Sequence, residues 1–137
     1  MRYRFDECLE RGKIVKIPAD PALIAKELRE AEADLTAAER SLLDHQEKWA
    51  IIQAYYSLFH TLRSRIFGKG YREKSHRCLK YAVEALLVDE GEIDSVVLEQ
   101  FRFAMDLREG ADYGCIYDAD SARIVVSSAR SVFERVR

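Results

Sequence analysis

Apolar residues recur from residue 20 onwards at the three- and four-residue spacing of amphipathic helices. Asp20-Pro21 supplies an N-cap followed by a proline at the first helical position. The stripe that follows predicts a first helix with one buried face, whose members are Ile24, Leu28, Ala31, Leu35, Ala38 and Leu42. The opposite face, which includes Glu27, is charged and is expected to lie in solvent.

The second expected helix covers about 47–67 and is the most apolar part of the chain. It ends at the glycine-containing turn 68–70. Its spacing predicts an inner face made of Trp49, Ile52, Tyr55, Phe59, Leu62 and Ile66.

Three shorter periodic stretches complete the pattern. Ser75 is expected to cap a third helix that ends near 89–91, and a fourth begins at Asp94 or Ser95 and reaches Arg108. The fifth begins at Asp118. No stretch has the two-residue period of a strand. The pattern therefore predicts an all-α fold, an up-and-down bundle of four to five antiparallel helices. Residues 20–137 form this domain, and 1–19 are expected to be an irregular N-terminal strap, extended over 12–18.

Length and cysteine usage favour one intracellular domain. A chain of 137 residues is long enough for a single core. Cys8, Cys78 and Cys115 are odd in number and widely spaced, and no long apolar run accompanies them, which predicts a cytoplasmic protein with reduced thiols and no membrane segment. His76 lies near Cys78, but no second ligand pair follows, so neither a metal site nor a cofactor is expected.

The formal net charge of -2 gives no overall attraction to nucleic acid, so a polyanion site has to be a local patch. Basic residues gather between 63 and 80, where Glu73 is the sole acid. The residues expected to contact RNA phosphates are Arg63, Lys69, Arg72, Lys74 and Arg77. A purely solvated charged face is the alternative interpretation.

Two clusters carry residue types that a helical core does not require. Spacings of three, four and three place Gln53, Tyr56, His60 and Arg63 on one edge of the second helix. Arginine offers a fork for phosphate, tyrosine a stacking ring, and histidine a proton donor or acceptor near neutral pH. Hydrogen bonds within the bundle would account for the same residues without a ligand.

The second cluster follows the fourth helix, where Gly110 and Gly114 bracket Ala-Asp-Tyr and allow the backbone to bend. Arg108, Asp112 and Tyr113 are expected to lie close together there and to form a pocket wall. A structural alternative is an ion pair between Arg108 and Asp112, with Tyr113 packed on the core.

These segments together resemble HEPN domains, the "higher eukaryotes and prokaryotes nucleotide-binding" modules. The resemblance rests on Ala-Tyr-Tyr-Ser-Leu-Phe-His at 54–60, Lys-Gly-Tyr at 69–71, Lys-Ser-His at 74–76 and Arg-Glu-Gly-Ala-Asp-Tyr at 108–113. It implies a helical bundle, a symmetric homodimer with a cleft between protomers, and pairing with a minimal nucleotidyltransferase. Such pairs often act as toxin and antitoxin.

Catalytic members of the family resemble one another in an Arg followed, after four to six residues, by a His, and they cleave RNA without metal. Arg108 matches that Arg, but Tyr113 stands where the His would fall. A tyrosine, with a reference pKa of about 10, is a poor substitute in proton transfer. His60 could supply the imidazole if the bundle brings it beside Arg108.

Three functional hypotheses follow. The favoured one is a non-catalytic or weakly catalytic module that binds a nucleotide or RNA phosphate. The alternatives are a metal-independent ribonuclease toxin that uses Arg108 with His60 or Tyr113, and a dimerisation scaffold. The residues expected to bind the ligand are Gln53, Tyr56, His60, Arg63, Arg108, Asp112 and Tyr113.

Overall fold

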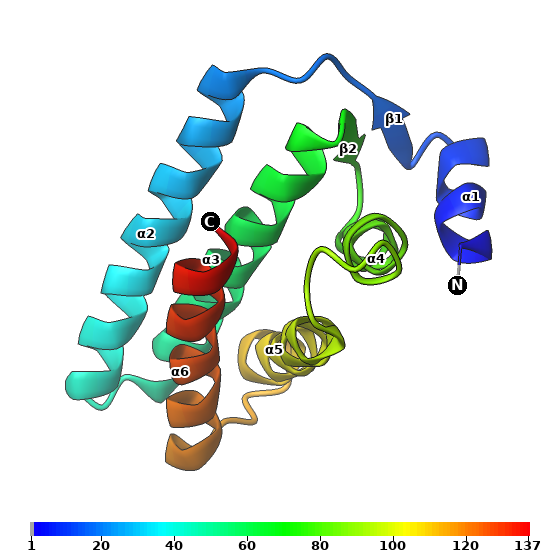
Figure 1. The fold of residues 1–137 in the computed structure, drawn as a ribbon. Helices are drawn as coiled ribbons and strands as arrows, with labels where there is room; N and C mark the ends of the chain where they lie inside the picture. The colour runs from blue at the N-terminus through cyan, green and yellow to red at the C-terminus, as the bar shows by residue number, and fades with distance from the viewer. Residues whose placement is uncertain (1) are drawn as a thin grey trace.

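A long antiparallel hairpin of two helices, α2 (Pro21–Leu43) and α3 (Glu47–Gly68), forms one side of the fold (Figure 1). The structure is a computed structural model that describes residues 2–137. Asp20 caps α2 by accepting a hydrogen bond from the Ala22 amide, and Pro21 takes the first helical position. The predicted bounds of both helices are confirmed to within a residue or two.

Helices α4, α5 and α6 begin at the predicted caps. α4 (His76–Val83) continues into a short π-helical turn, η1 (Glu84–Val88), and is followed by α5 (Ser95–Tyr113) and α6 (Ala119–Val136). The side chains of Ser75, Asp94 and Asp118 each accept a backbone N–H from the first turn. α5 runs past Gly110 to Tyr113, so the helix extends beyond the end expected at Arg108.

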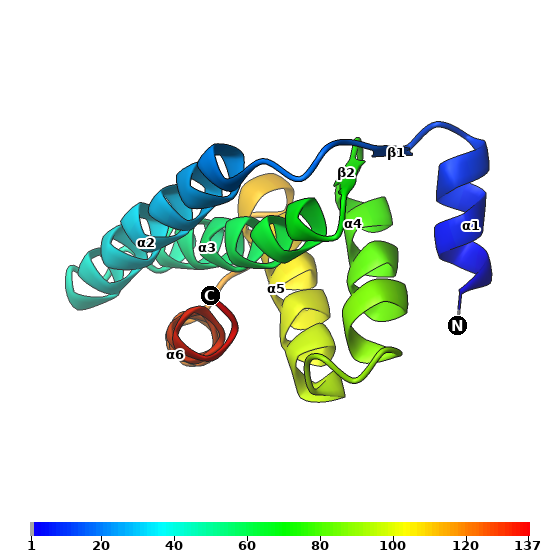
Figure 2. The same cartoon turned by 45° about the horizontal axis from the view of Figure 1, so that its top comes forward.

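The helices form two groups that cross. α6 packs against α2 and α3, while α4 and α5 run across this group and are seen end-on in Figure 1 and lengthwise in Figure 2. The core between them holds large side chains with no solvent exposure, among them Tyr55, Leu62, Ile66, Phe67, Leu87 and Phe101.

The mostly helical fold is confirmed. Within residues 2–137, no helix combines the length and the apolar character needed to cross a bilayer.

Two details of the predicted buried faces are wrong. Trp49, in the first turn of α3, is half exposed because Ala50 and Ile51, which are fully buried, take the inner face of the helix at that point. Glu27, expected in solvent, is only 7% exposed and faces α3.

The N-terminal segment is more regular than the strap expected for 1–19, of which residue 1 lies outside the described residues. Tyr3–Glu10 form helix α1, and Phe5 is fully buried there. The extended part contains strand β1 (Ile14–Lys16), which pairs antiparallel with β2 (Tyr71–Glu73). Strands of three residues are too short to produce a recognisable two-residue period, which is why the sequence pattern contained no strand.

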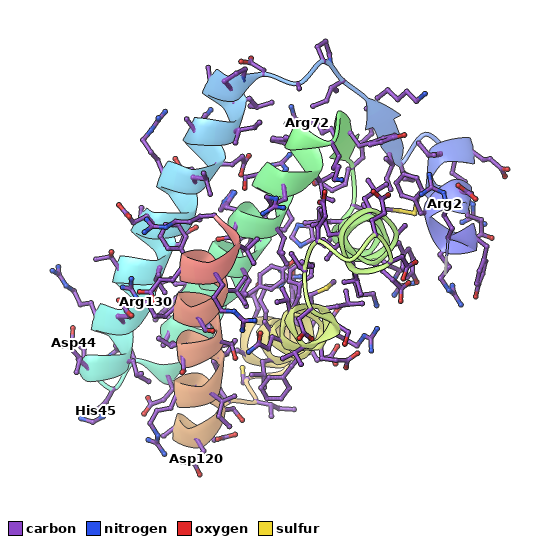
Figure 3. All side chains as sticks on the ribbon, viewed as in Figure 1. Arg2, Asp44, His45, Arg72, Asp120 and Arg130 are labelled. Carbon is purple, nitrogen blue, oxygen red and sulfur yellow. A yellow bond between two sulfur atoms is a disulfide. The ribbon has the colours of Figure 1, made fainter. Side chains whose placement is uncertain are left out.

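A disulfide joins α1 to α4. Cys8 and Cys78 have Cα atoms 6.0 Å apart and are bonded through sulfur, visible as a yellow bond between the two helices in Figure 3. Cys115 is exposed and unpaired. The prediction of three reduced thiols is therefore wrong for two of them, because packing of α1 on α4 brings together cysteines that are 70 residues apart in sequence.

Candidate functional site

His76, at the start of α4, lies within a cluster of aromatic rings from α3. Its ring stacks on Tyr55 with centroids 5.7 Å apart and lies 4.7 Å from the Phe59 ring. The Nδ1 atom of His76 is 2.5 Å from the Tyr55 hydroxyl. Ser75 caps α4 by accepting a hydrogen bond from the Cys78 amide, so the helix begins at His76.

The bond between Tyr55 and His76 determines which ring nitrogen carries the proton. Burial raises the pKa of the Tyr55 phenol, so the hydroxyl stays protonated and donates to Nδ1. The ring proton of neutral His76 then resides on Nε2. Burial, together with the charges of Arg108 and Arg63, lowers the pKa of His76. At neutral pH His76 is therefore an uncharged imidazole that presents an N–H donor.

Arg108, in the second half of α5, lies against the same rings. Its guanidinium carbon is 5.0 Å from the Tyr55 ring centroid and 6.0 Å from that of Tyr56. The Nε atom of Arg108 is buried and has no hydrogen-bond partner among residues 2–137. A buried donor without a partner costs roughly 1–3 kcal/mol, so this arginine is stacked in place without being neutralised.

A hollow of about 210 Å³ opens between α4 and α5 beside Arg108 and His76. We call it the Arg108 hollow. Its basic residues outnumber its acidic ones, and the complete lining is His76, Arg77, Lys80, Arg102, Met105, Asp106, Arg108 and Glu109. An anion of the size of a phosphate fits this volume and this charge.

Arg63, by contrast, is fully neutralised by two buried carboxylates. Its Nη1 lies 3.0 Å from Glu27 Oε1, and its Nε lies 2.8 Å from Glu73 Oε1. Burial raises the pKa of Glu73, and Arg63 opposes that rise. His60 joins the same network, with Nδ1 2.5 Å from Glu27 and Nε2 3.7 Å from Asp34. These residues hold α2, α3 and β2 together.

Arg108 differs from the other partly buried arginines in having no carboxylate partner within residues 2–137. Each of the others pairs with a carboxylate: Arg63 with Glu27 and Glu73, Arg65 with Glu92, Arg102 with Glu99, and Arg130 with Glu39. Figure 3 shows Arg130 between α6 and α2. Within residues 2–137, Arg108 is the partly buried arginine that forms no ion pair.

The residues expected to share one ligand are divided between several places. Tyr56 lies between the two groups, because its ring is 6.4 Å from His60 and also contacts Arg108. The Gln53 side chain lies 2.7 Å from Ser41 Oγ and links α2 to α3. His76, not His60, is the histidine that faces Arg108.

Asp112 and Tyr113 lie on the solvent side of the end of α5. Tyr113 is 77% exposed, and within the described residues no ion pair joins Arg108 to Asp112. The helix continues through Gly110, so Tyr113 comes one turn and a half after Arg108 on α5 and not at a bend.

The expected basic patch is also divided. Lys69 pairs with Glu90 and Glu92 at the end of α3. Arg72, labelled in Figure 3, and Lys74 are exposed on and after β2. Arg77 is exposed and borders the Arg108 hollow. Of the predicted patch, Arg77 thus lies at the candidate site, and Lys80 and Arg102 join it there.

The donor atoms of the site suit an oxyanion. Arginine and a neutral imidazole supply N–H groups, and Lys80 adds an ammonium. Among residues 2–137, no group of three or more His, Cys, Asp and Glu side chains is arranged to hold a metal ion.

The family model described as HEPN domain matches residues 25–137, which include α3, α4, α5 and α6. The chain belongs to the HEPN domain family. The HEPN match begins inside α2, so α1 and β1 lie outside it.

A curated relative of this HEPN chain carries the name "Putative toxin MJ0605" and comes from Methanocaldococcus jannaschii. It is 28% identical over 100 residues, which cover 67% of this chain and 75% of the relative.

Sequence reasoning missed His76 and the carboxylates that neutralise Arg63. The Lys-Ser-His segment at 74–76, on which the HEPN resemblance partly rested, was the signal that could have drawn attention to His76.

Proposed function

We propose that this HEPN domain binds a phosphate group of RNA or of a nucleotide in the Arg108 hollow. The observation that carries the proposal is the charge of Arg108, which is partly buried and yet has no carboxylate partner within residues 2–137. A cation in that position is stabilised by a bound anion, because its guanidinium lies against aromatic rings and neither Asp106 nor Glu109, which also line the hollow, forms an ion pair with it.

His76 and Lys80 complete the phosphate contacts. The Nε2–H of neutral His76 donates to one phosphate oxygen, and the Lys80 ammonium and the Arg108 fork serve the others. A bound phosphate favours the protonated imidazole, so binding raises the pKa of His76 above its lowered value in the free protein. Affinity for phosphate is therefore expected to increase as the pH falls below neutral.

A binding assay with a labelled single-stranded RNA at low salt tests the proposal. Arg108→Ala should weaken binding about 10- to 150-fold, since hydrogen bonds to charged groups contribute about 1.5–3 kcal/mol. Arg123→Ala, which removes an exposed arginine on α6 outside the hollow, is the matched control and should bind as the unaltered protein does. Equal affinity of the Arg108→Ala and Arg123→Ala variants would refute the proposal.

A metal-independent ribonuclease is the second candidate, and the closeness of His76 to Arg108 favours it. Arg108 would hold the scissile phosphate while an imidazole takes the proton of the ribose 2′-hydroxyl. The lone pair of His76, however, lies on Nδ1 and accepts the Tyr55 proton. General-base action at Nε2 would thus require the other tautomer, which is why we rank binding ahead of cleavage.

Cleavage of end-labelled RNA in the presence of a chelator separates these two functions. RNA that is bound but stays intact supports the binding module. Cleavage that is lost in both Arg108→Ala and His76→Asn, and kept in Arg123→Ala, would establish the ribonuclease instead. Asparagine retains a polar atom near the position of Nδ1, so the Tyr55 hydroxyl keeps a partner in that variant.

We also propose that the chain acts as one half of a toxin–antitoxin-type pair with a minimal nucleotidyltransferase, and that it forms a homodimer. The toxin name of the relative and the family support the pairing. Large exposed apolar side chains near the α2–α3 turn and the start of α6 support self-association, namely Leu43, Trp49, Ile116, Tyr117 and Ile124. Light scattering of the protein alone tests the dimer, and co-purification with the co-expressed nucleotidyltransferase tests the pair.

A further inference from the structure

A second hollow adjoins the Arg108 hollow on the side of α1. It has a volume of about 400 Å³ and lies among α1, α4 and α5. We call it the Tyr3–Tyr81 hollow. Its walls are Tyr3, Arg4, Lys80, Tyr81, Glu84, Leu98 and Arg102. Lys80 and Arg102 also line the Arg108 hollow, so the two hollows share a wall.

Two tyrosines and two cations lie together in this second hollow. The Arg4 guanidinium carbon lies 5.2 Å from the Tyr3 ring centroid and 5.5 Å from that of Tyr81. The Lys80 ammonium lies 5.3 Å from the Tyr81 ring. Tyr3 is 53% exposed, so its ring is open to a ligand. Neither Arg4 nor Lys80 pairs with a carboxylate within residues 2–137.

Flat aromatic surfaces beside unpaired cations are the combination that binds single-stranded nucleic acid. Bases stack on tyrosine rings, and arginine or lysine contacts the phosphates between them. A volume of about 400 Å³ falls in the range of small-ligand sites and suffices for a nucleobase. Leu98 adds an apolar wall against which the edge of a base can pack.

Helix α1 is held firmly enough to act as the wall of a site. The disulfide between Cys8 and Cys78 ties α1 to α4, and Phe5 is fully buried with its ring 5.4 Å from that of Tyr71. Tyr3 and Arg4 belong to this anchored helix, which lies outside the part of the chain matched by the HEPN model. The second hollow is therefore built in part by a segment of this chain beyond the matched region.

We propose that the Tyr3–Tyr81 hollow binds a nucleobase adjacent to the phosphate held in the Arg108 hollow. The ligand class is a nucleobase linked through ribose to phosphate. The strand runs along the exposed side of α4, with a base on Tyr3 and Tyr81 and the backbone on Lys80 and Arg102. This inference rests on the proposed function, because the neighbouring phosphate is the one assigned to Arg108.

The first test measures fluorescence anisotropy of a labelled single-stranded RNA with Tyr3→Ala and Tyr3→Trp. Loss of a stacking surface should weaken binding about 5- to 150-fold in Tyr3→Ala, and Tyr3→Trp should restore it. Phe103→Ala is the matched control, since Phe103 is 40% exposed on α5, lines neither hollow and lies outside the side chains assigned to self-association. The side chain of Tyr3 is exposed, so its removal leaves the fold intact, which circular dichroism verifies.

Two further ligands separate the base from the phosphate. An abasic strand with the same number of phosphates should bind the unaltered protein and Tyr3→Ala equally, because only stacking is removed. Adenosine monophosphate in place of RNA tests whether the two hollows bind a free nucleotide or a nucleic-acid strand. Tighter binding of the strand supports the continuous path along α4, and equal binding of the two overturns it.

The outcomes for this hollow and for the Arg108 hollow differ. If Tyr3→Ala binds RNA as the unaltered protein does while Arg108→Ala does not bind, the Tyr3–Tyr81 hollow is refuted and the proposed function stands. If Arg108→Ala has no effect, the proposed function fails, and the path that joins the two hollows fails with it. We expect weaker RNA binding in both the Tyr3→Ala and the Arg108→Ala variants, with Phe103→Ala unaffected.

Discussion

Replacing Arg63 by methionine should destabilise the protein far more than the same replacement of Arg108. Arg63 pairs with Glu27 and Glu73, which are 7% and 6% exposed. Methionine keeps the apolar stem but leaves two buried carboxylates without their cation, and such a loss costs about 3–5 kcal/mol. Arg108→Met removes no ion pair and eliminates a buried donor that has no partner, so its effect should stay within about 1 kcal/mol.

Urea unfolding measures the difference. With a slope of about 1.5 kcal/mol per molar, a loss of about 3–5 kcal/mol lowers the midpoint of Arg63→Met by roughly 2–3 M. The midpoint of Arg108→Met should shift by less than about 0.7 M, while its RNA affinity falls. Equal destabilisation by the two substitutions would refute the distinction between a neutralised and an unneutralised arginine.

The pH dependence of Arg63→Met provides an internal check. Burial already raises the pKa of Glu73, and loss of Arg63 raises it further. In the folded variant Glu73 then keeps its proton to a higher pH than in the unfolded chain. The stability of the variant therefore decreases as the pH rises from the ordinary glutamate pKa to the raised pKa of Glu73. The deficit should be largest above that window and should shrink on acidification. A second substitution, Glu73→Gln, should recover part of the loss at neutral pH.

Three further measurements follow from other parts of the structure. Reduction of the Cys8–Cys78 disulfide, or Cys8→Ser, should lower the free energy of unfolding by about 2–4 kcal/mol because it frees a loop of 70 residues, whereas Cys115→Ser should change the urea midpoint little. Because the pKa of His76 is lowered, the unfolded chain binds a proton on this histidine at higher pH than the folded protein does, and stability should fall as the pH drops through about 6.5. Unfolding curves of His76→Asn should show a shallower fall in stability over the same pH range. An equal fall in the variant would contradict the burial of His76. Gly70 has φ of +87°, so Gly70→Ala should cost about 1–2 kcal/mol in the same urea assay, and an unchanged midpoint would contradict that backbone conformation.

The two arginines illustrate why residue type alone does not identify a binding residue. Arg63 and Arg108 both belong to the ligand-binding set predicted from the sequence. In the structure each lies over an aromatic ring, Arg63 over Phe59 and Arg108 over Tyr55. Only the carboxylates around them distinguish the two. Glu27 is 36 residues away from Arg63 in sequence, on a different helix. The charged face of α2 was expected to lie in solvent from its periodicity, yet it carries Glu27, whose carboxylate neutralises Arg63.

The same reasoning applies to the histidines. The spacing on α3 places His60 on one edge with Tyr56, and the structure agrees. Whether that edge faces α2 or α5 depends on the rotation of α3 within the bundle. His60 faces Glu27 on α2, and the place beside Arg108 is taken by His76 from α4. Helical periodicity defines which residues share a face, but it leaves open which neighbour covers that face.

The sequence by itself determined the fold class and the starts of helices α2 to α6, because both depend on local interactions. Asp20, Ser75, Asp94 and Asp118 bond to amides two or three residues further on, so their effect can be recognised without a tertiary structure. The tertiary structure alone decided the Cys8–Cys78 disulfide, the neutralisation of Arg63, the meeting of His76 with Arg108, and the hollow between α1 and α4. Each of these joins residues from different elements, and their contact depends on how whole helices pack and cross.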